Sequence, residues 1–265
     1  MRIGAKLPAS GPLHAGIVQH AVVLERAGFD SLWVSDHIVM PRTIASPYPF
    51  AADGRATWPT DTPYVDALIA LALAAAVTSR VRLGTAALVL PQRNPVLVAK
   101  QAASIDVVSG GRLELGIGAG WLAEEFEALD VPFERRGARM DEWISILRAC
   151  WTGTPPAFAG EFYSLPADTL CLPPPAHEIP LLVGGHSAVA LRRARRAGGW
   201  LAQQDADKLD PDELAGFEGR VVLRVIGPLT DAQRLRELED AGVDEVIVDA
   251  PADEASAAAL LEALR

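Results

Sequence analysis

The sequence predicts an α/β fold, a single (β/α)8 barrel, also called a TIM barrel, that spans residues 1–265 as one domain. Eight strand-like apolar runs are each followed by a helix-like run, and an alternation of this kind requires a parallel sheet. The pattern repeats without a break in composition, which favours closure into a barrel over an open sheet. A chain of 265 residues, 50% of them hydrophobic, also has the usual size of one such domain.

The elements follow one another as strand and helix along the whole chain. The predicted strands are Ile3–Leu7, Ser31–Ser35, Val81–Leu88, Leu113–Gly116, Pro180–Val183, Trp200–Gln203, Val221–Val225 and Glu245–Val248. The helices that follow them in register are His14–Gly28, Tyr64–Thr78, Pro95–Val108, Arg136–Trp151, Ala188–Ala197, Asp210–Phe217, Asp231–Ala241 and Glu254–Leu264.

Two long interruptions break this regular spacing. Ile38–Pro63 follows the second strand and Thr152–Ile179 precedes the fifth, and both are rich in Pro, Gly and aromatic residues. Loops of this length in a compact domain are more often lids or pocket walls than accidents. We therefore expect one or both to border the functional site.

Charge and composition exclude several classes of function. A net charge of −10 argues against a nucleic-acid partner, which requires a basic surface. No apolar run is long enough to span a membrane, and the N-terminus lacks the pattern of a secretory signal. The two cysteines, Cys150 and Cys171, are too few for a disulfide framework and are not in metal-binding spacing. These observations predict a cytoplasmic protein without a metal site.

One basic cluster stands out in this acidic chain. It comprises Arg192, Arg193, Arg195 and Arg196, interleaved with alanine. Because the segment is predicted to be a helix, we interpret the cluster as a solvated helix face.

Two neighbouring strands of the predicted barrel end in small residues. The third ends in GTAA (Gly84–Ala87), and the fourth runs into GIGAG (Gly116–Gly120). Small residues allow close approach of a flat group, and ligands bind at the carboxyl ends of barrel strands. The pattern is therefore compatible with a floor for a planar cofactor, and equally with tight packing of helices on the sheet.

Asp36 and His37 follow the second strand directly. An acid and an imidazole at this face of a barrel are placed for binding or for proton transfer, although a turn-forming aspartate beside an exposed histidine gives the same pattern. The next loop carries Tyr48, Phe50 and Trp58, which either close over His37 or pack on the barrel rim.

The fifth strand runs into Gly184, Gly185, His186 and Ser187 before a helix. Glycines that lead to a serine cap leave backbone N–H groups pointing outward at a helix N-terminus, which suits a phosphate, although an unoccupied helix cap is also common. The segment GIGAGW lacks the third glycine of a dinucleotide-binding fingerprint, so a Rossmann fold is a poor interpretation.

Together these motifs resemble the luciferase-like monooxygenase superfamily, and especially its coenzyme F420-dependent oxidoreductase branch. The resemblance rests on FDSLWVSDH, LGTAALVLPQRNPV, SIDVVSGGRLELGIGAGWLAEEFEALDVPFERRGARMDE and PLLVGGHS, in this order. It covers most of the chain and is densest from Phe29 to Trp151.

The resemblance implies a barrel that binds the deazaflavin F420, or alternatively FMN, near the carboxyl ends of its strands. A non-prolyl cis peptide that supports the ring in this family corresponds to Ala86-Ala87. His37 corresponds to a position that serves proton transfer in several relatives. The cofactor-binding residues implied in the same way are Asp36, Ala86, Ala87, Val89, Ala119, Gly184, Gly185, His186 and Ser187.

The activity implied by this branch is hydride transfer between C5 of the deazaflavin and a small organic substrate. Trp121 and Trp58 are expected to line the substrate side, with His37 as the proton donor or acceptor. An FMN-dependent monooxygenase and a non-catalytic relative that binds F420 or a flavin are the alternatives. We expect a homodimer, with a small molecule as substrate.

The chain also departs from its better-known relatives. Trp121 stands where sugar-phosphate dehydrogenases of the superfamily have a glutamate, and Ala119 where bacterial luciferases have an arginine for the flavin phosphate. Only Gln204–Gly219 separates the sixth strand from the seventh, a region that often enlarges the substrate pocket in the superfamily. The first difference argues against a glucose-6-phosphate dehydrogenase, and the second argues against FMN and light emission. The third predicts a shallower pocket or one that another subunit completes.

Overall fold

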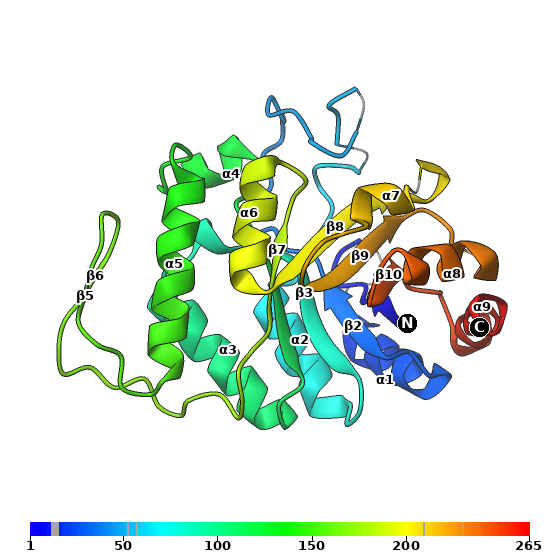
Figure 1. The fold of residues 1–265 in the computed structure, drawn as a ribbon, viewed down its shortest axis with the longest axis horizontal. Coiled ribbons are helices and arrows are strands. Elements are labelled where there is room, and N and C mark those ends of the chain that lie inside the picture. Colours follow the sequence, from blue (N-terminus) through cyan, green and yellow to red (C-terminus); the bar gives the residue numbers. More distant parts are fainter. Residues whose placement is uncertain (12–15, 52, 57, 209, 230) are drawn as a thin grey trace.

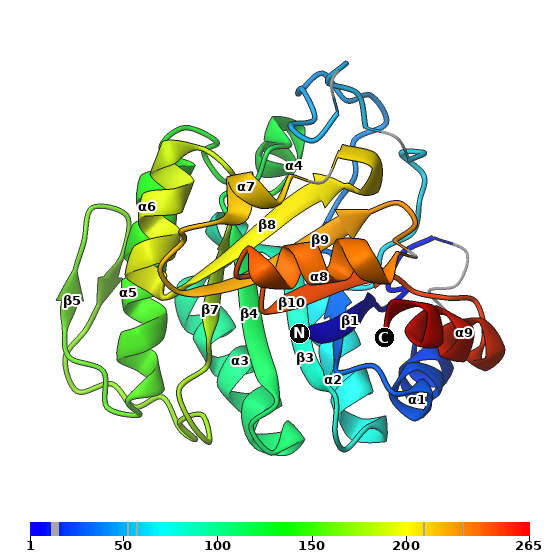
Figure 2. The same ribbon diagram turned by 45° about the vertical axis from the view of Figure 1, so that its right-hand side comes forward.

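The computed structural model describes residues 1–11, 16–51, 53–56, 58–208, 210–229 and 231–265, and it confirms the predicted (β/α)8 barrel. Parallel strands close in the order β1-β10-β9-β8-β7-β4-β3-β2, with helices packed around them (Figures 1 and 2). The barrel strands are β1 (Arg2–Lys6), β2 (Ser31–Val34), β3 (Arg82–Val89), β4 (Leu113–Gly118), β7 (Leu181–Gly184), β8 (Gly199–Asp205), β9 (Arg220–Ile226) and β10 (Glu245–Asp249).

The outer helices follow the predicted order. They are α1 (Ile17–Ala27), α2 (Ala67–Val77), α3 (Pro95–Ser109), α5 (Arg136–Trp151), α6 (Ala188–Ala197), α7 (Pro211–Leu214), α8 (Ala232–Asp240) and α9 (Glu254–Leu264). His14, the predicted first residue of the first helix, lies outside the described residues. Helix α7 is shorter than the predicted Asp210–Phe217, because the chain is already extended at Ala215 and turns at Gly216 with φ +73°.

Helix ends are set by local chemistry at several junctions. Asn94 accepts hydrogen bonds from the backbone N–H groups of Val96 and Leu97, and Pro95 occupies the first turn of α3. Gly110, with φ +70°, ends the same helix in the left-handed conformation.

Short elements that the sequence did not predict lie in the connections. They are helix α4 (Ala123–Ala128), the 3-10 turns η2 (Leu90–Gln92) and η3 (Ala206–Lys208), and the hairpin of β5 (Phe158–Ala159) and β6 (Ser164–Leu165). The hairpin lies in the long connection before β7 and projects beside α5 (Figure 1). The loop after β2 has no helix or strand in its described part, and it lies above the barrel next to α4 (Figures 1 and 2).

The middle of the barrel is filled by inward-pointing apolar side chains: Trp33, Leu182, Leu201, Val222 and Ile247. Trp33 is fully buried, and glycines on the neighbouring strands make room for its ring. A Cβ atom at Gly84 would lie 2.3 Å from the indole, and one at Gly4 2.9 Å from its Nε1 atom. These glycines are therefore packing requirements of the core.

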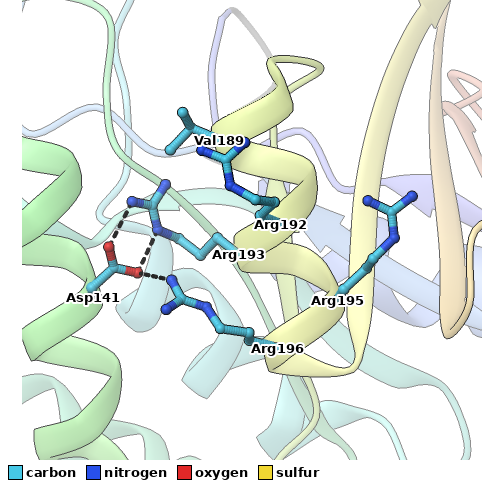
Figure 3. A pocket seen from close by; sticks show the side chains of 6 residues that line it. All are labelled: Asp141, Val189, Arg192, Arg193, Arg195 and Arg196. Atoms are coloured by element: carbon cyan, nitrogen blue, oxygen red, sulfur yellow. Dashed lines mark hydrogen bonds and ion pairs between the residues drawn. The ribbon is translucent and has the colours of Figure 1, made fainter.

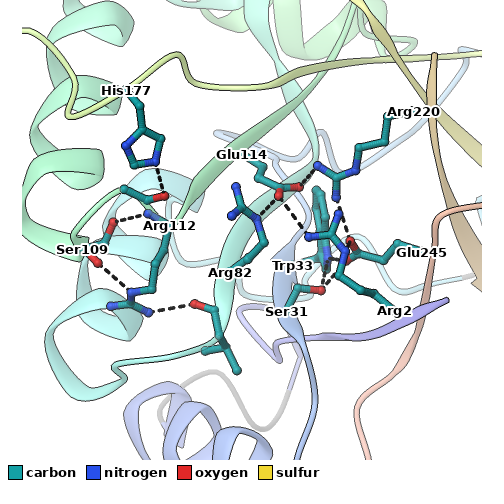
Figure 4. A network of polar contacts seen from close by, with 12 residues as sticks. Arg2, Ser31, Trp33, Arg82, Ser109, Arg112, Glu114, His177, Arg220 and Glu245 are labelled. Carbon is teal, nitrogen blue, oxygen red and sulfur yellow. Dashed lines mark hydrogen bonds and ion pairs between the residues drawn. The ribbon is translucent and has the colours of Figure 1, made fainter.

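Below this apolar layer, at the amino ends of the strands, charged side chains close the barrel (Figure 4). Glu114 and Glu245 are fully buried, and they are paired with Arg2, Arg82 and Arg220. Glu245 also accepts hydrogen bonds from the Ser31 hydroxyl and from Nε1 of Trp33. Each buried carboxylate is thus neutralised, as burial of a charge requires.

Above the apolar layer lies the top layer, at the carboxyl ends of the strands. Side chains two residues apart share one face of a strand, so the residues that follow the apolar layer by two positions also point inward. The top layer is Lys6, Ser35, Ala86, Gly118, Gly184, Gln203, Arg224 and Asp249, with Ala87 packed on the same apolar cluster. One half of this layer is bare and the other is charged.

The arginine cluster of α6 is in part the predicted solvated face, since Arg192, Arg195 and Arg196 are exposed, and Arg193 is the exception. Arg193 is buried and binds the carboxylate of Asp141 on α5 through two hydrogen bonds of 2.7 and 2.8 Å, and Arg196 binds the same group at 2.9 Å (Figure 3). A further bond of 3.0 Å joins Arg193 to the Gly137 carbonyl. Part of the cluster therefore ties α6 to α5.

Within the described residues, no helix is both long and apolar enough to cross a membrane.

Candidate active site at the carboxyl ends of the barrel strands

The bare half of the top layer forms a floor from β3, β4 and β7. A Cβ atom added at Gly118 would lie 3.6 Å from that of Ala87, and one at Gly184 would lie 3.8 Å from it. The peptide between Ala86 and Ala87 is cis, which confirms the expectation drawn from the resemblance. The small residues of GTAA, GIGAG and GGHS thus meet around one alanine.

Asp36 lies at the edge of this floor, but it faces the protein. One carboxylate oxygen accepts the N–H of Val89 at 2.9 Å, and the other accepts the guanidinium of Arg93 at 2.7 Å. Burial raises the pKa of this carboxyl, and the charge of Arg93 opposes that shift. Since both oxygens are occupied, Asp36 positions the end of β3, and its predicted contact with a cofactor is not tested by the structure.

His37 is held by a second carboxylate, which the sequence interpretation missed. Its Nδ1 atom lies 3.1 Å from Oε2 of Glu125, whose side chain is 1% exposed. Burial acts to raise the pKa of Glu125, but the hydrogen bond and charge of His37 outweigh it and leave the pKa below its ordinary value. An ionised Glu125 accepts the Nδ1 proton, so Nε2 of His37 is left to exchange a proton.

Glu125 and its neighbour Glu124 also fix the loop after β2. Oε1 of Glu125 accepts the N–H groups of Ile38 at 2.6 Å and Val39 at 3.2 Å. Glu124 binds Ser46 through its backbone N–H at 3.0 Å and its hydroxyl at 2.7 Å. Two adjacent acids in a short α4 that directly follows the fourth strand were the available signal for this role.

Aromatic side chains from this loop cover the site. The predicted substrate-pocket residues are Trp58 and Trp121, and their ring centroids lie 6.4 Å apart. The centroid of the His37 ring lies 6.2 Å from that of Trp58 and 6.3 Å from that of Trp121. Tyr48 packs edge-on against both tryptophans at 5.1 Å, and Tyr64 lies 5.1 Å from His37. The structure therefore brings His37, Trp58 and Trp121 together with Tyr48, one of the loop aromatics expected to close over His37, and with Tyr64, which the sequence interpretation did not assign to the site.

The remaining predicted residues lie on either side of the floor. Val89 is 8% exposed, and Ala119 is packed half-buried against the core. At Gly120, where φ is +85°, a Cβ atom would lie 2.7 Å from Cγ1 of Val89, so only glycine fits this approach.

The GGHS turn begins α6, as predicted. The Ser187 hydroxyl accepts the N–H of Ala190 at 3.2 Å, and Nε2 of His186 accepts the N–H of Gln203 at 3.2 Å. Among the described residues, no acceptor is bonded to the N–H of Ala188 in the first turn. The turn therefore keeps a free donor and a helix N-terminus, both of which suit an anion.

Comparisons with known proteins identify chains that are similar to this one. The model of the luciferase-like monooxygenase family matches residues 1–214. An uncharacterised protein of Mycobacterium tuberculosis is 39% identical over 244 residues, which is 86% of this chain and 82% of that protein. A protein of Amycolatopsis mediterranei named F420-dependent glucose-6-phosphate dehydrogenase is 31% identical over 202 residues, 75% of this chain and 56% of that protein.

A similar solved structure is that of an F420-dependent secondary alcohol dehydrogenase in complex with an F420-acetone adduct. It superimposes with a TM-score of 0.77 over 100% of this chain and 99% of that one, at 16% identity. At this level of identity the likeness supports the barrel fold.

Proposed function

The chain belongs to the luciferase-like monooxygenase family, and on this premise we propose that it is an oxidoreductase that uses coenzyme F420 for hydride transfer to or from a small organic substrate. The observation that carries the proposal is the position of His37. Its imidazole is oriented by Glu125 and lies beneath the aromatic cover at the edge of a bare floor.

The residues present fit a flat ring with a phosphate-bearing tail. Ala86, Ala87, Gly118 and Gly184 would support the ring face, because they offer backbone and methyl groups without longer side chains. The GGHS turn at the start of α6 would hold the phosphate through backbone N–H groups. When bound, F420 supplies a carrier that accepts or delivers two electrons as one hydride at C5.

The protein's own part is orientation, exclusion of water and control of one proton. Oxidation of an alcohol carbon releases a hydride and a proton, and reduction of a carbonyl takes up both. His37 would accept or donate that proton at Nε2, while Glu125 keeps Nδ1 protonated. Tyr48, Trp58 and Trp121 would hold the substrate over the floor and keep bulk water away.

An FMN-dependent monooxygenase is the alternative within the same family. Titration of the purified protein with F420 and with FMN, followed by fluorescence, separates the two. We expect saturable binding of F420 in the micromolar range. Micromolar binding of FMN alone would reject the proposal.

A non-catalytic binding protein would keep the floor and the phosphate turn but would not need His37. We predict that His37→Ala lowers turnover by roughly 10²–10⁴-fold, the usual contribution of a general acid or base, and leaves F420 affinity within about threefold. Turnover is measured by the absorbance of oxidised F420 against a panel of alcohols and carbonyl compounds. Equal turnover in the variant and the wild type would remove His37 from the mechanism.

The homodimer expected from the sequence stays a proposal. A second subunit would complete a substrate pocket that the short connection between β8 and β9 leaves small. Analytical ultracentrifugation with and without F420 tests it, and a monomer under both conditions would reject it.

A further inference from the structure

The charged half of the top layer has no role in the mechanism above. It consists of Lys6 at the end of β1, Arg224 on β9 and Asp249 at the end of β10. Gly4 faces Trp33 and Glu245 inside the barrel, so Lys6, two residues later on the same strand, points into the barrel mouth. These residues line the mouth on the side away from Gly118 and Gly184, because β1, β10 and β9 lie across the barrel from β4 and β7.

The two cations of this half are bonded differently. Arg224 is 8% exposed, pairs with Asp249 and donates to the carbonyls of Val225 and Ile247. The ammonium group of Lys6 forms no hydrogen bond or ion pair with any residue in the described part of the chain. It is nevertheless half-buried, and burial, followed by the charge of Arg224, lowers its pKa. Its ammonium group has therefore lost water without gaining an acceptor.

The charges of the cluster indicate the kind of group that would satisfy it. Two cations and one carboxylate give a net charge of +1, which one carboxylate of a ligand would balance. A phosphate dianion would leave the cluster negative. Asp249 is 58% exposed and pairs with Arg224. Its charge also acts to raise the pKa of Lys6, less strongly than burial and Arg224 lower it, but it forms no ion pair with the Lys6 ammonium.

The sequence supports a specific use of this lysine. The chain has 24 cationic residues, of which only Lys6, Lys100 and Lys208 are lysine. Lys100 donates to the carbonyl of Leu172, and Lys208 pairs with Asp205. Lys6 alone among the three lies in the barrel mouth without a partner in the described residues.

We propose that Lys6 and Arg224 form a subsite for one carboxylate group of the substrate, beside the floor that would hold the cofactor ring. The substrate would then be a small organic acid whose reacting carbon lies over the floor while its carboxylate binds Lys6. This inference rests on the proposed function in one respect only, namely that the bound carboxylate belongs to the substrate. The subsite itself can be tested without cofactor.

The small number of lysines makes a direct test possible. Reductive methylation with ¹³C-formaldehyde labels three lysines and the N-terminal amine, and Lys6→Met assigns the signal of Lys6. The labelled protein is titrated with benzoate and acetate, with benzamide and acetamide as neutral matches, and with inorganic phosphate. We expect a saturable shift of the Lys6 signal with the carboxylates only, and an upward shift of its titration midpoint when benzoate is bound.

Variants separate a subsite from a merely structural lysine. Benzoate binding, measured by calorimetry, should weaken at least tenfold in Lys6→Met, recover in large part in Lys6→Arg, and be unchanged in Lys208→Met. Circular dichroism checks that each variant is folded.

Three results would overturn the subsite: equal shifts with benzamide, unchanged benzoate affinity in Lys6→Met, or tighter binding of phosphate than of any carboxylate. Titration with F420 is run in parallel. If the wild-type protein does not bind F420, the proposed function is rejected, whereas the result for the subsite is unaffected.

Discussion

Glu125 serves two purposes through its two oxygens. Oε2 fixes the imidazole of His37, and Oε1 holds the backbone of Ile38 and Val39. A positioning residue of this kind acts on the reaction through another side chain. Replacement of its charge should therefore change the state of His37 before it changes the fold.

We predict that Glu125→Gln removes the preference of His37 for the Nδ1-protonated form and lowers turnover roughly 10–100-fold, less than the full 10²–10⁴-fold range of a lost general acid or base. Nitrogen-proton correlation spectra of the imidazoles report the tautomer directly, and the chain has only five histidines to resolve. Glu124→Gln is the matched control, because that neighbour binds the loop without touching His37. An unchanged tautomer in Glu125→Gln would contradict the assignment.

Asp36 is a second residue whose environment predicts a measurable effect. Loss of its charge leaves the buried Arg93 with the more exposed Asp66 as its remaining carboxylate, and removal of one partner of a buried pair typically costs about 3–5 kcal/mol. We expect Asp36→Asn to lower the free energy of unfolding by about this amount in urea denaturation. Asp66→Asn is the control, since Asp66 is the more exposed partner of Arg93 and asparagine can still cap α2. A smaller loss in Asp36→Asn than in Asp66→Asn would contradict this view of Asp36.

At the scale of elements, the short helix α4 anchors the long loop through Glu124 and Glu125. Desolvation acts to raise the pKa of Glu124, but hydrogen bonds from Ser46 and backbone N–H groups outweigh it and lower the pKa to about 2. A depressed pKa means that the attachment contributes above the ordinary value of 4.5 and is lost as the pH falls from there towards about 2.

We therefore predict that the loop stays attached at neutral and weakly acidic pH and opens below pH 4.5. Its opening should change the fluorescence of Trp58, which belongs to the loop, and of Trp121, against which Trp58 packs. In Glu124→Gln the part of this fluorescence change that is due to Glu124 should be absent. An identical acid transition in the variant would assign loop opening to other groups.

The sequence predicted the regular elements well and the irregular ones poorly, for physical reasons. Helices α5, α6 and α9 have the predicted bounds. Side chains cap the N-termini of α6 and α9, at Ser187 and Asp253, whereas α5 begins without a side-chain cap. Helix α4 has six residues, too few for a periodic pattern, and contacts with the loop hold it in place. The role of Glu125 was missed because its partner, His37, lies 88 positions earlier in the chain, so no local sequence pattern joins the two residues. The small residues and His37 were found because each stands at a strand end, where the barrel topology alone fixes the location.

At the scale of the whole molecule, the barrel places its buried charge network and its candidate site at opposite ends of the strands. The bottom layer pairs buried acids with arginines, the middle layer is apolar around Trp33, and the top layer is bare on one side and charged on the other. Changes at the bottom should therefore alter stability without altering the site. This separation places catalytic variation at one end of the strands, as in other barrels of this class.

Glu245 allows the separation to be tested. This buried acid binds Ser31, Trp33 and two arginines, so Glu245→Ala leaves Arg2 and Arg220 with Glu114 as their remaining carboxylate. We predict a loss of about 3–5 kcal/mol in the free energy of unfolding, as expected when one member of a buried charge network is removed. Glu161→Ala, which breaks an exposed pair with Arg135, should leave the free energy of unfolding nearly unchanged, because solvent screens exposed ion pairs. Affinity for F420, measured on the folded fraction of each variant, should remain within about twofold of the wild type. A large loss of F420 affinity in folded Glu245→Ala would show that the bottom layer and the site are coupled through Trp33.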